Sequence, residues 1–266
     1  MNPIDQLKAA TTWMWAQGDY TAVGRLLEPA AIALADACEI RPGVKVLDVA
    51  TGNGNFAIAA ATRGGVVTAC DLTPHMLELA RARGVPARVQ IEWLIDDAEH
   101  LSFADGSYDL VASTFGAMFA PRPDLVAGEL LRVCRDGGLI AMANYSWDGF
   151  LGEMAKLFTR YSTRLPLDLP SPFEWGDPDV VNRRLGAARD IEVRPGTLRW
   201  NFDSVDAALD FWEATNAPTI ALKATVAPER YEEFRRDARR LMEDINGARD
   251  GGVELNSSYV SVLAKR

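Results

Sequence analysis

The chain has 266 residues, of which 48% are hydrophobic, so it is long enough for one large α/β domain or one domain with an insertion. Its formal net charge of −9 disfavours nucleic acids and anionic membranes as partners, because both would repel an acidic surface. The absence of a membrane-length apolar run or a signal peptide indicates a soluble, cytoplasmic protein, and three scattered cysteines with two histidines predict no disulfide framework and no metal site.

The N-terminal segment holds two amphipathic helices. Apolar residues recur at helical spacing over residues 4–39, and Gly18-Asp19 divides this stretch in two. Pro42-Gly43 then separates it from the following segment. We therefore assign residues 1–42 to helices that cover the site formed by the rest of the chain.

Short apolar strands alternate with helices between residues 43 and 145. Nearly continuous apolar strands of this kind form parallel sheets that helices cover on both faces. We interpret 43–145 as a Rossmann-like core, a fold that binds cofactors at the carboxyl ends of its strands. The predicted strands are 44–50, 66–71, 88–94, 108–114 and 138–145, and the predicted helices are 54–63, 74–83 and 123–134.

The alternation ends after residue 145. Residues 146–190 contain a helical pattern at 149–164, a proline-rich passage, and a second helix at 178–187. We interpret 146–190 as a helical cap, or lid, inserted over the carboxyl edge of the sheet, where open α/β sheets bind ligands. Residues 191–266 should complete the core, with strands at 190–202 and 253–264 and helices near 204–224 and 228–246.

A small-residue turn follows the first predicted strand, in the sequence VLDVATGNGNFA at 46–57. Gly52 and Gly54 allow the backbone to approach a ligand closely, and the helix behind them presents unpaired N–H groups. Asp48, at the end of the strand, suits a ligand that carries positive charge. Asp71 follows Gly52 by roughly the 20 residues that a dinucleotide fingerprint requires, so an NAD(P)-binding oxidoreductase is an alternative interpretation.

Further ligand candidates follow the next predicted strands. Asp71 can accept hydrogen bonds from two ribose hydroxyls, and we expect Asp71→Ala to weaken cofactor binding without changing the fold. Asp97, with a backbone N–H near Ala98, can offer an acceptor and a donor to an adenine edge, and Met76 can pack on that ring. The oxidoreductase interpretation leaves Asp97 unexplained. Successive candidates at one sheet edge therefore favour an adenosine-containing cofactor.

These motifs resemble the class I S-adenosylmethionine-dependent methyltransferases, and most of all their small-molecule branch. That branch includes ubiquinone/menaquinone C-methyltransferases and many natural-product enzymes. The resemblance implies a sheet of seven mostly parallel strands whose last strand is antiparallel, and it implies S-adenosylmethionine as cofactor with S-adenosylhomocysteine as product. The matching motifs are VLDVATGNG (46–54), DLTPHM (71–76), DAEHLSF (97–103), ADGSYDLV (104–111) and LRVCRDGG (131–138).

The resemblance also assigns cofactor contacts. Asp48, Gly52 and Gly54 would line the methionine and sulfonium side, and Thr114 would contact the cofactor backbone. Ala50 departs from the pattern, because the family usually has the first glycine of the turn there. A methyl group at this position is tolerable if its φ stays negative, but it narrows the site. The cofactor-binding candidates are Asp48, Ala50, Gly52, Gly54, Asp71, Leu72, Met76, Asp97, Ala98 and Thr114.

Aromatic residues in the N-terminal helices and near the insertion predict an apolar acceptor pocket. We expect in-line methyl transfer to a small, partly apolar metabolite in a closed pocket, with no residue that must act as a general base. Whether carbon, nitrogen or oxygen is methylated stays open, as does a different reaction on the same cofactor. The acceptor-pocket candidates are Trp15, Tyr20, Tyr145, Trp147, Phe173 and Trp175.

Overall fold

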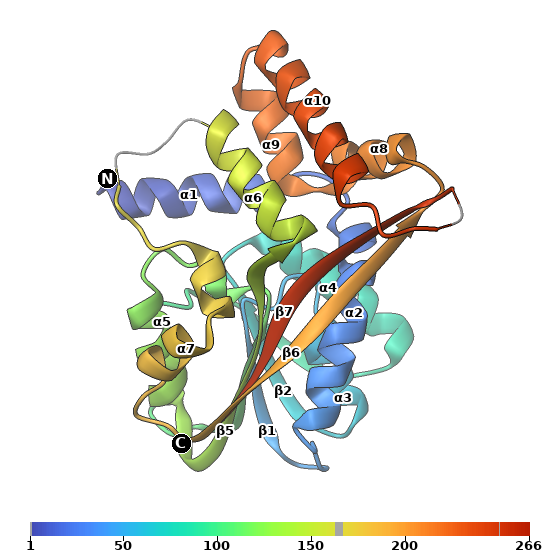
Figure 1. The fold of residues 1–266 in the computed structure, drawn as a ribbon. Coiled ribbons are helices and arrows are strands. Elements are labelled where there is room, and N and C mark those ends of the chain that lie inside the picture. Colours follow the sequence, from blue (N-terminus) through green and yellow to red (C-terminus); the bar gives the residue numbers. More distant parts are fainter. Residues whose placement is uncertain (1, 163–166, 250) are drawn as a thin grey trace.

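The computed structural model describes residues 2–162, 167–249 and 251–266. Seven strands form one sheet in the order β3-β2-β1-β4-β5-β7-β6 (Figure 1). All neighbouring pairs are parallel except the two that β7 makes with β5 and β6. This confirms the predicted sheet with an antiparallel last strand. The strands are β1 (Lys45–Val49), β2 (Val66–Asp71), β3 (Ile91–Ile95), β4 (Tyr108–Thr114), β5 (Cys134–Gly149), β6 (Arg189–Phe202) and β7 (Val253–Lys265).

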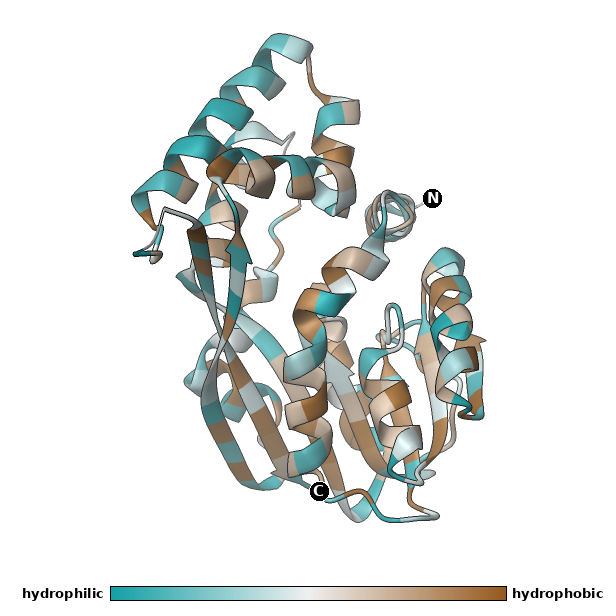
Figure 2. Ribbon diagram, turned by 90° about the vertical axis from the view of Figure 1, so that its right-hand side faces the viewer, coloured by the Kyte–Doolittle hydropathy of each residue, from teal (hydrophilic) through white to brown (hydrophobic). Residues whose placement is uncertain are grey.

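Helices cover both faces of this sheet (Figure 1). The core strands are apolar on both sides, because Val46, Leu47 and Val49 of β1 are all fully buried. Figure 2 shows apolar strands beside helices that carry hydrophilic outer segments. The helices packed along the sheet are α2 (Tyr20–Ala37), α3 (Asn55–Thr62), α4 (Pro74–Ala87) and α5 (Pro123–Val133), and α7 (Pro178–Arg184) packs against α5.

A group of helices lies beyond one end of the sheet, where β6 and β7 extend past the other strands (Figure 1). Its interior is aromatic, with ring centroids 5.4 Å apart in the pairs Phe150–Trp212 and Trp200–Trp212. Within the described ranges, no helix is long and apolar enough to cross a membrane. The group consists of α6 (Phe150–Tyr161), α8 (Val205–Thr215), α9 (Ala217–Thr225) and α10 (Pro228–Asp244).

The single helical pattern predicted near 204–224 is two helices. Asn216 lies between them, and its side-chain oxygen accepts a hydrogen bond from the Thr219 backbone N–H at 3.1 Å. Pro218 is in the first turn of α9, where its missing N–H removes no helical bond. Asn216 and Pro218 therefore end one helix and begin the next, a boundary hidden by the continuous apolar spacing.

The segment 146–190 divides between two parts of the molecule. Its first helix, α6, packs against α10 in the distal helix group. The short 3-10 helix η2 (Pro172–Gly176) packs against β5, and α7 packs against η2 and α5. The cap that we predicted from this segment is thus not one unit above the sheet edge.

Candidate functional site

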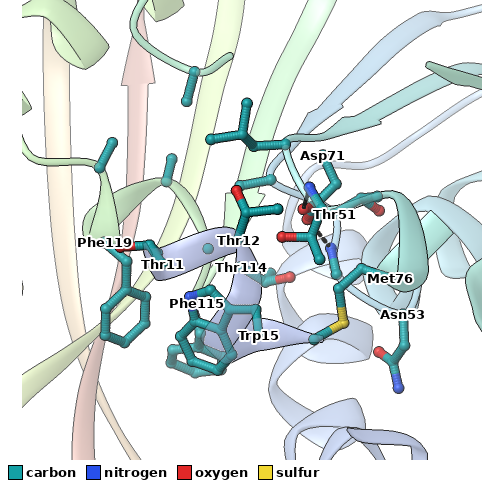
Figure 3. Close-up of a pocket in the computed structure, with 18 of the residues that line it drawn as sticks. Thr11, Thr12, Trp15, Thr51, Asn53, Asp71, Met76, Thr114, Phe115 and Phe119 are labelled. Atoms are coloured by element: carbon teal, nitrogen blue, oxygen red, sulfur yellow. Dashed lines mark hydrogen bonds between the residues drawn. The ribbon is translucent and has the colours of Figure 1, made fainter. Parts of the chain in front are cut away.

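A pocket that is partly open to solvent lies at the carboxyl ends of β1, β2, β3 and β4 (Figure 3). The turns after these strands form its floor. Helix α1 (Pro3–Trp15) contributes Lys8, Thr11, Thr12 and Trp15 to its lining. The predicted residues that line it are Trp15, Tyr20, Ala50, Gly52, Asp71, Leu72, Met76, Asp97, Ala98 and Thr114.

Asp71, the last residue of β2, fixes the glycine turn that follows β1. One carboxylate oxygen accepts a hydrogen bond from the Gly52 backbone N–H at 2.8 Å, and the other accepts one from Thr73 N–H at 2.8 Å. Burial raises the pKa of this carboxyl, and the two N–H donors oppose that shift. A carboxylate can accept several hydrogen bonds, so a ligand hydroxyl can add to these contacts. Asp71 is thus both a structural anchor and a candidate ribose acceptor.

Asp48 and Gly54 lie behind the turn and do not line the pocket, contrary to the contacts that the resemblance implied. Asp48 is fully buried, and its Oδ2 accepts from Thr51 Oγ1 at 2.6 Å and from Ala57 N–H at 3.0 Å. A Cβ on Gly54 would lie 2.9 Å from the Trp93 ring, so glycine there is required by packing. Both residues support the conformation of the turn from the side that faces away from the pocket.

Asp48 should make stability depend on pH. Burial raises the pKa of its carboxyl from 3.8 to about 7, so folding favours the protonated form. This contribution is complete below about pH 4 and is lost as the pH rises through 7. In ligand-free protein, the unfolding free energy of the wild type minus that of Asp48→Asn should fall by about 2 kcal/mol between pH 5 and pH 8.

Denaturant unfolding of both chains at several pH values measures this difference. Carboxylates elsewhere in the fold, such as Asp109, have lowered pKa values and act in the opposite direction. They are present in both chains and cancel in the comparison. A difference that does not change with pH would contradict the buried position of Asp48.

The backbone of Ala50 is in the left-handed region, with φ of 54°, so the negative φ at which a methyl group would be tolerated without strain is not adopted. The turns after β1 and β4 approach each other closely at this residue. A Cβ placed on Gly116 would lie 2.1 Å from the Ala50 carbonyl oxygen and 2.8 Å from its Cβ. Phe115, next to Gly116, also has a positive φ of 53°. Strained backbone on both turns therefore borders the pocket.

Replacing Ala50 by glycine should stabilise the fold, because the left-handed conformation costs an alanine about 1–2 kcal/mol. The greater freedom of glycine in the unfolded chain offsets part of this gain, which leaves an expected increase of about 0.5–1 kcal/mol. Denaturant unfolding measures it. The matched control is Ala59→Gly within helix α3, which should lower stability by a similar amount. Destabilisation by Ala50→Gly would show that no strain is relieved there.

The end of the pocket lined by Lys8, Asp97 and Ala98 contains an ionic network that the sequence did not reveal. Lys8 of α1 lies 2.5 Å from Asp97 Oδ2 and also pairs with Glu99, whose side chain is fully buried. Arg122 donates to the same Glu99 carboxylate from its backbone N–H at 2.6 Å and from its guanidinium. In the sequence, Lys8 resembles any lysine on an exposed helix face, so no local signal could identify it.

Aromatic rings line the opposite end of the pocket. Trp15 contacts Tyr20 and Phe119 edge to face, at centroid distances of 5.7 and 5.3 Å. Phe115 and Phe119 were not among the predicted residues, although Phe115 directly follows the Thr114 strand end and Phe119 lies five residues after it. The hydroxyl-bearing Thr11 and Thr12 lie beside these rings (Figure 3). This end combines apolar walls with a few neutral hydroxyl groups.

Four predicted acceptor residues do not line the pocket. Tyr145 stacks on Phe115 at 4.3 Å and forms a layer behind it. Phe173 stacks behind Tyr145, and Trp147 on Phe173 in turn. These rings lie there because η2 packs against β5 and not over the strand ends. The four are Tyr145, Trp147, Phe173 and Trp175. Trp175 is fully buried, and the Arg184 guanidinium lies 4.8 Å from its ring centroid.

Comparison with known proteins agrees with this geometry. A family model described as a methyltransferase domain matches residues 47–142. An uncharacterized protein of Mycobacterium tuberculosis is 40% identical over 217 residues, which are 80% of this chain and 79% of that protein. Demethylmenaquinone methyltransferase of Renibacterium salmoninarum is 35% identical over 131 residues, about half of either chain (49% and 53%).

A solved structure has the same fold at lower sequence identity. Haemonchus contortus phosphoethanolamine N-methyltransferase 2, in complex with S-adenosylmethionine, superposes with a TM-score of 0.53 and 19% identity. The match covers 90% of this chain and 52% of that enzyme. Outside the matched domain lies α1, which supplies one wall of the pocket.

Proposed function

We propose, because this chain belongs to the class I S-adenosylmethionine-dependent methyltransferases, that it methylates a small, partly apolar acceptor at the aromatic end of its pocket. The division of the pocket into two ends carries the proposal. The charged lining residues, Lys8, Asp71, Asp96 and Asp97, come from α1 and from the ends of β2 and β3. The aromatic end is neutral, which suits an uncharged acceptor better than a phosphate or a carboxylate.

The lining residues fit the cofactor position by position. Asp71 would accept the ribose hydroxyls, and Asp97 would accept from the adenine amino group. Leu72 and Met76 would pack on the base, while Gly52 and Thr114 face the remaining length of the pocket. No side chain at Gly52 obstructs the approach, and a Cβ there would already lie 3.7 Å from Tyr20. This fit supports S-adenosylmethionine as the bound cofactor.

When bound, the cofactor supplies an electrophilic methyl group: its bond to the sulfonium sulfur breaks as the acceptor bond forms, and the electron pair stays on sulfur. The protein residues then act by positioning and by excluding water. Burial raises the pKa of Tyr20 far above its ordinary value, so this hydroxyl stays protonated. Tyr20 would therefore donate a hydrogen bond that orients the acceptor and would not act as a base.

Two measurements test this function. Titration calorimetry should detect binding of S-adenosylhomocysteine and no binding of NAD or NADP. Transfer from radiolabelled S-adenosylmethionine to cell extracts fractionated by size should place label in small, organic-soluble products, whose masses identify the acceptor. Label found only in macromolecules would refute the acceptor class, and binding of a nicotinamide cofactor alone would refute the cofactor.

A further inference from the structure

Helix α1 lies lengthwise along the pocket. Lys8, Thr11 and Trp15 are spaced three and four residues apart, so they share one helix face, and all three line the pocket. At 1.5 Å per residue, the face extends about 10 Å from Lys8 to Trp15. Figure 3 shows Thr11, Thr12 and Trp15 of this helix gathered beside the strand ends. One helix therefore reaches from the end of the pocket lined by Lys8 and Asp97 to the aromatic end lined by Trp15.

Apolar burial holds α1 only weakly. None of its described residues is buried, and Trp13 is 47% exposed. The polar contact at Lys8 is much more enclosed, because its side chain is 13% exposed and that of Glu99 is 0% exposed. An ion pair shielded from water is stronger than one on the surface, and breaking this one leaves the buried Glu99 carboxylate with Arg122 as its remaining cationic partner. Lys8 is thus the firmest attachment of α1 at this end.

Lys8 also fixes the loop that follows β3. It bridges Asp97 and Glu99, and Asp97 in turn accepts a hydrogen bond from the Glu99 backbone N–H at 3.0 Å. We propose that Lys8 is a positioning residue for the cofactor, which holds α1 across the pocket and orients Asp97, so that cofactor exchange requires this ion pair to break. The inference rests on the proposed function, because it takes Asp97 as the residue that meets adenine.

The test compares the full chain with Lys8→Met, Lys8→Arg and a control, Lys265→Met. Lys265 also pairs with a carboxylate, Asp190, but is 66% exposed and distant in the fold from the lining. Stopped-flow tryptophan fluorescence gives the dissociation rate of S-adenosylhomocysteine. It should rise about tenfold in Lys8→Met, the factor that about 1.4 kcal/mol provides. KM for S-adenosylmethionine should rise without a fall in kcat, and Lys8→Arg should restore most of the wild-type behaviour.

Hydrogen exchange of the ligand-free chains gives an independent reading. Amides of residues 3–15 should exchange faster in Lys8→Met, while those of α10 stay unchanged. A dissociation rate within twofold of wild type in a folded Lys8→Met chain would overturn the proposal. If the wild type binds no S-adenosylhomocysteine, the proposed function fails, and exchange alone shows whether Lys8 holds α1.

Discussion

Replacement of Asp71 by alanine is expected to weaken S-adenosylhomocysteine binding by about 1.5–3 kcal/mol, or roughly 10- to 150-fold in Kd. The carboxylate would lose charge-assisted hydrogen bonds to the ribose, and no neighbouring side chain can replace it at the end of β2. Its loss also releases the Gly52 N–H, so the turn that carries the cofactor is less ordered before binding. Both effects lower affinity in the same direction.

The structure does not support the expectation that Asp71→Ala leaves the stability of the fold unchanged. Asp71 is only 9% exposed and anchors the backbone at both Gly52 and Thr73, so the fold should also lose a few kcal/mol of stability. Calorimetric titration must therefore be made well below the melting temperature of the variant. Asp136→Ala is the control, because Asp136 is 98% exposed and pairs only at the surface. An unaltered Kd in folded Asp71→Ala protein would remove Asp71 from the site.

The cofactor side of the site was largely accessible from the sequence. In a parallel sheet, the residues that end neighbouring strands must meet at one edge, so strand prediction alone brings Asp71, Asp97 and Thr114 together. The same reasoning could not distinguish residues that line the pocket from those that support it. Asp48 ends its strand as Asp71 does, but its side chain points beneath the turn and is fully buried.

The acceptor side depends on packing between distant segments, which local patterns do not encode. Tyr145 and Phe173 were grouped with the pocket because they lie near a predicted lid, whereas the structure places them behind Phe115. The pocket wall comes from α1, in agreement with the prediction that residues 1–42 cover the site, and Trp15 is among its lining residues. The close approach of Ala50 to Gly116 was equally hidden, because Gly116 is a residue on another strand's turn.

That contact leads to the second large effect, expected for Gly116→Ala. The backbone of Gly116 has φ of −110°, so alanine is acceptable there in conformation, and only the space is lacking. The new methyl carbon would lie 2.1 Å from the Ala50 carbonyl oxygen, which belongs to backbone and cannot rotate away. The turns after β1 and β4 must therefore move apart, which should cost about 2–4 kcal/mol of stability.

The same movement displaces Ala50 and Gly116 themselves, both of which line the pocket, so S-adenosylhomocysteine affinity should fall at least tenfold even where the chain remains folded. Gly128→Ala is the matched control, since its Cβ would meet nothing within 4 Å and it lies inside helix α5, where alanine should stabilise by up to about 1 kcal/mol. Adding Ala50→Gly to Gly116→Ala should restore little, because the closest obstacle is the carbonyl oxygen and not the alanine methyl group. Denaturant unfolding and calorimetry on the four chains measure both quantities. Wild-type stability and affinity in Gly116→Ala would show that the two turns are not in contact.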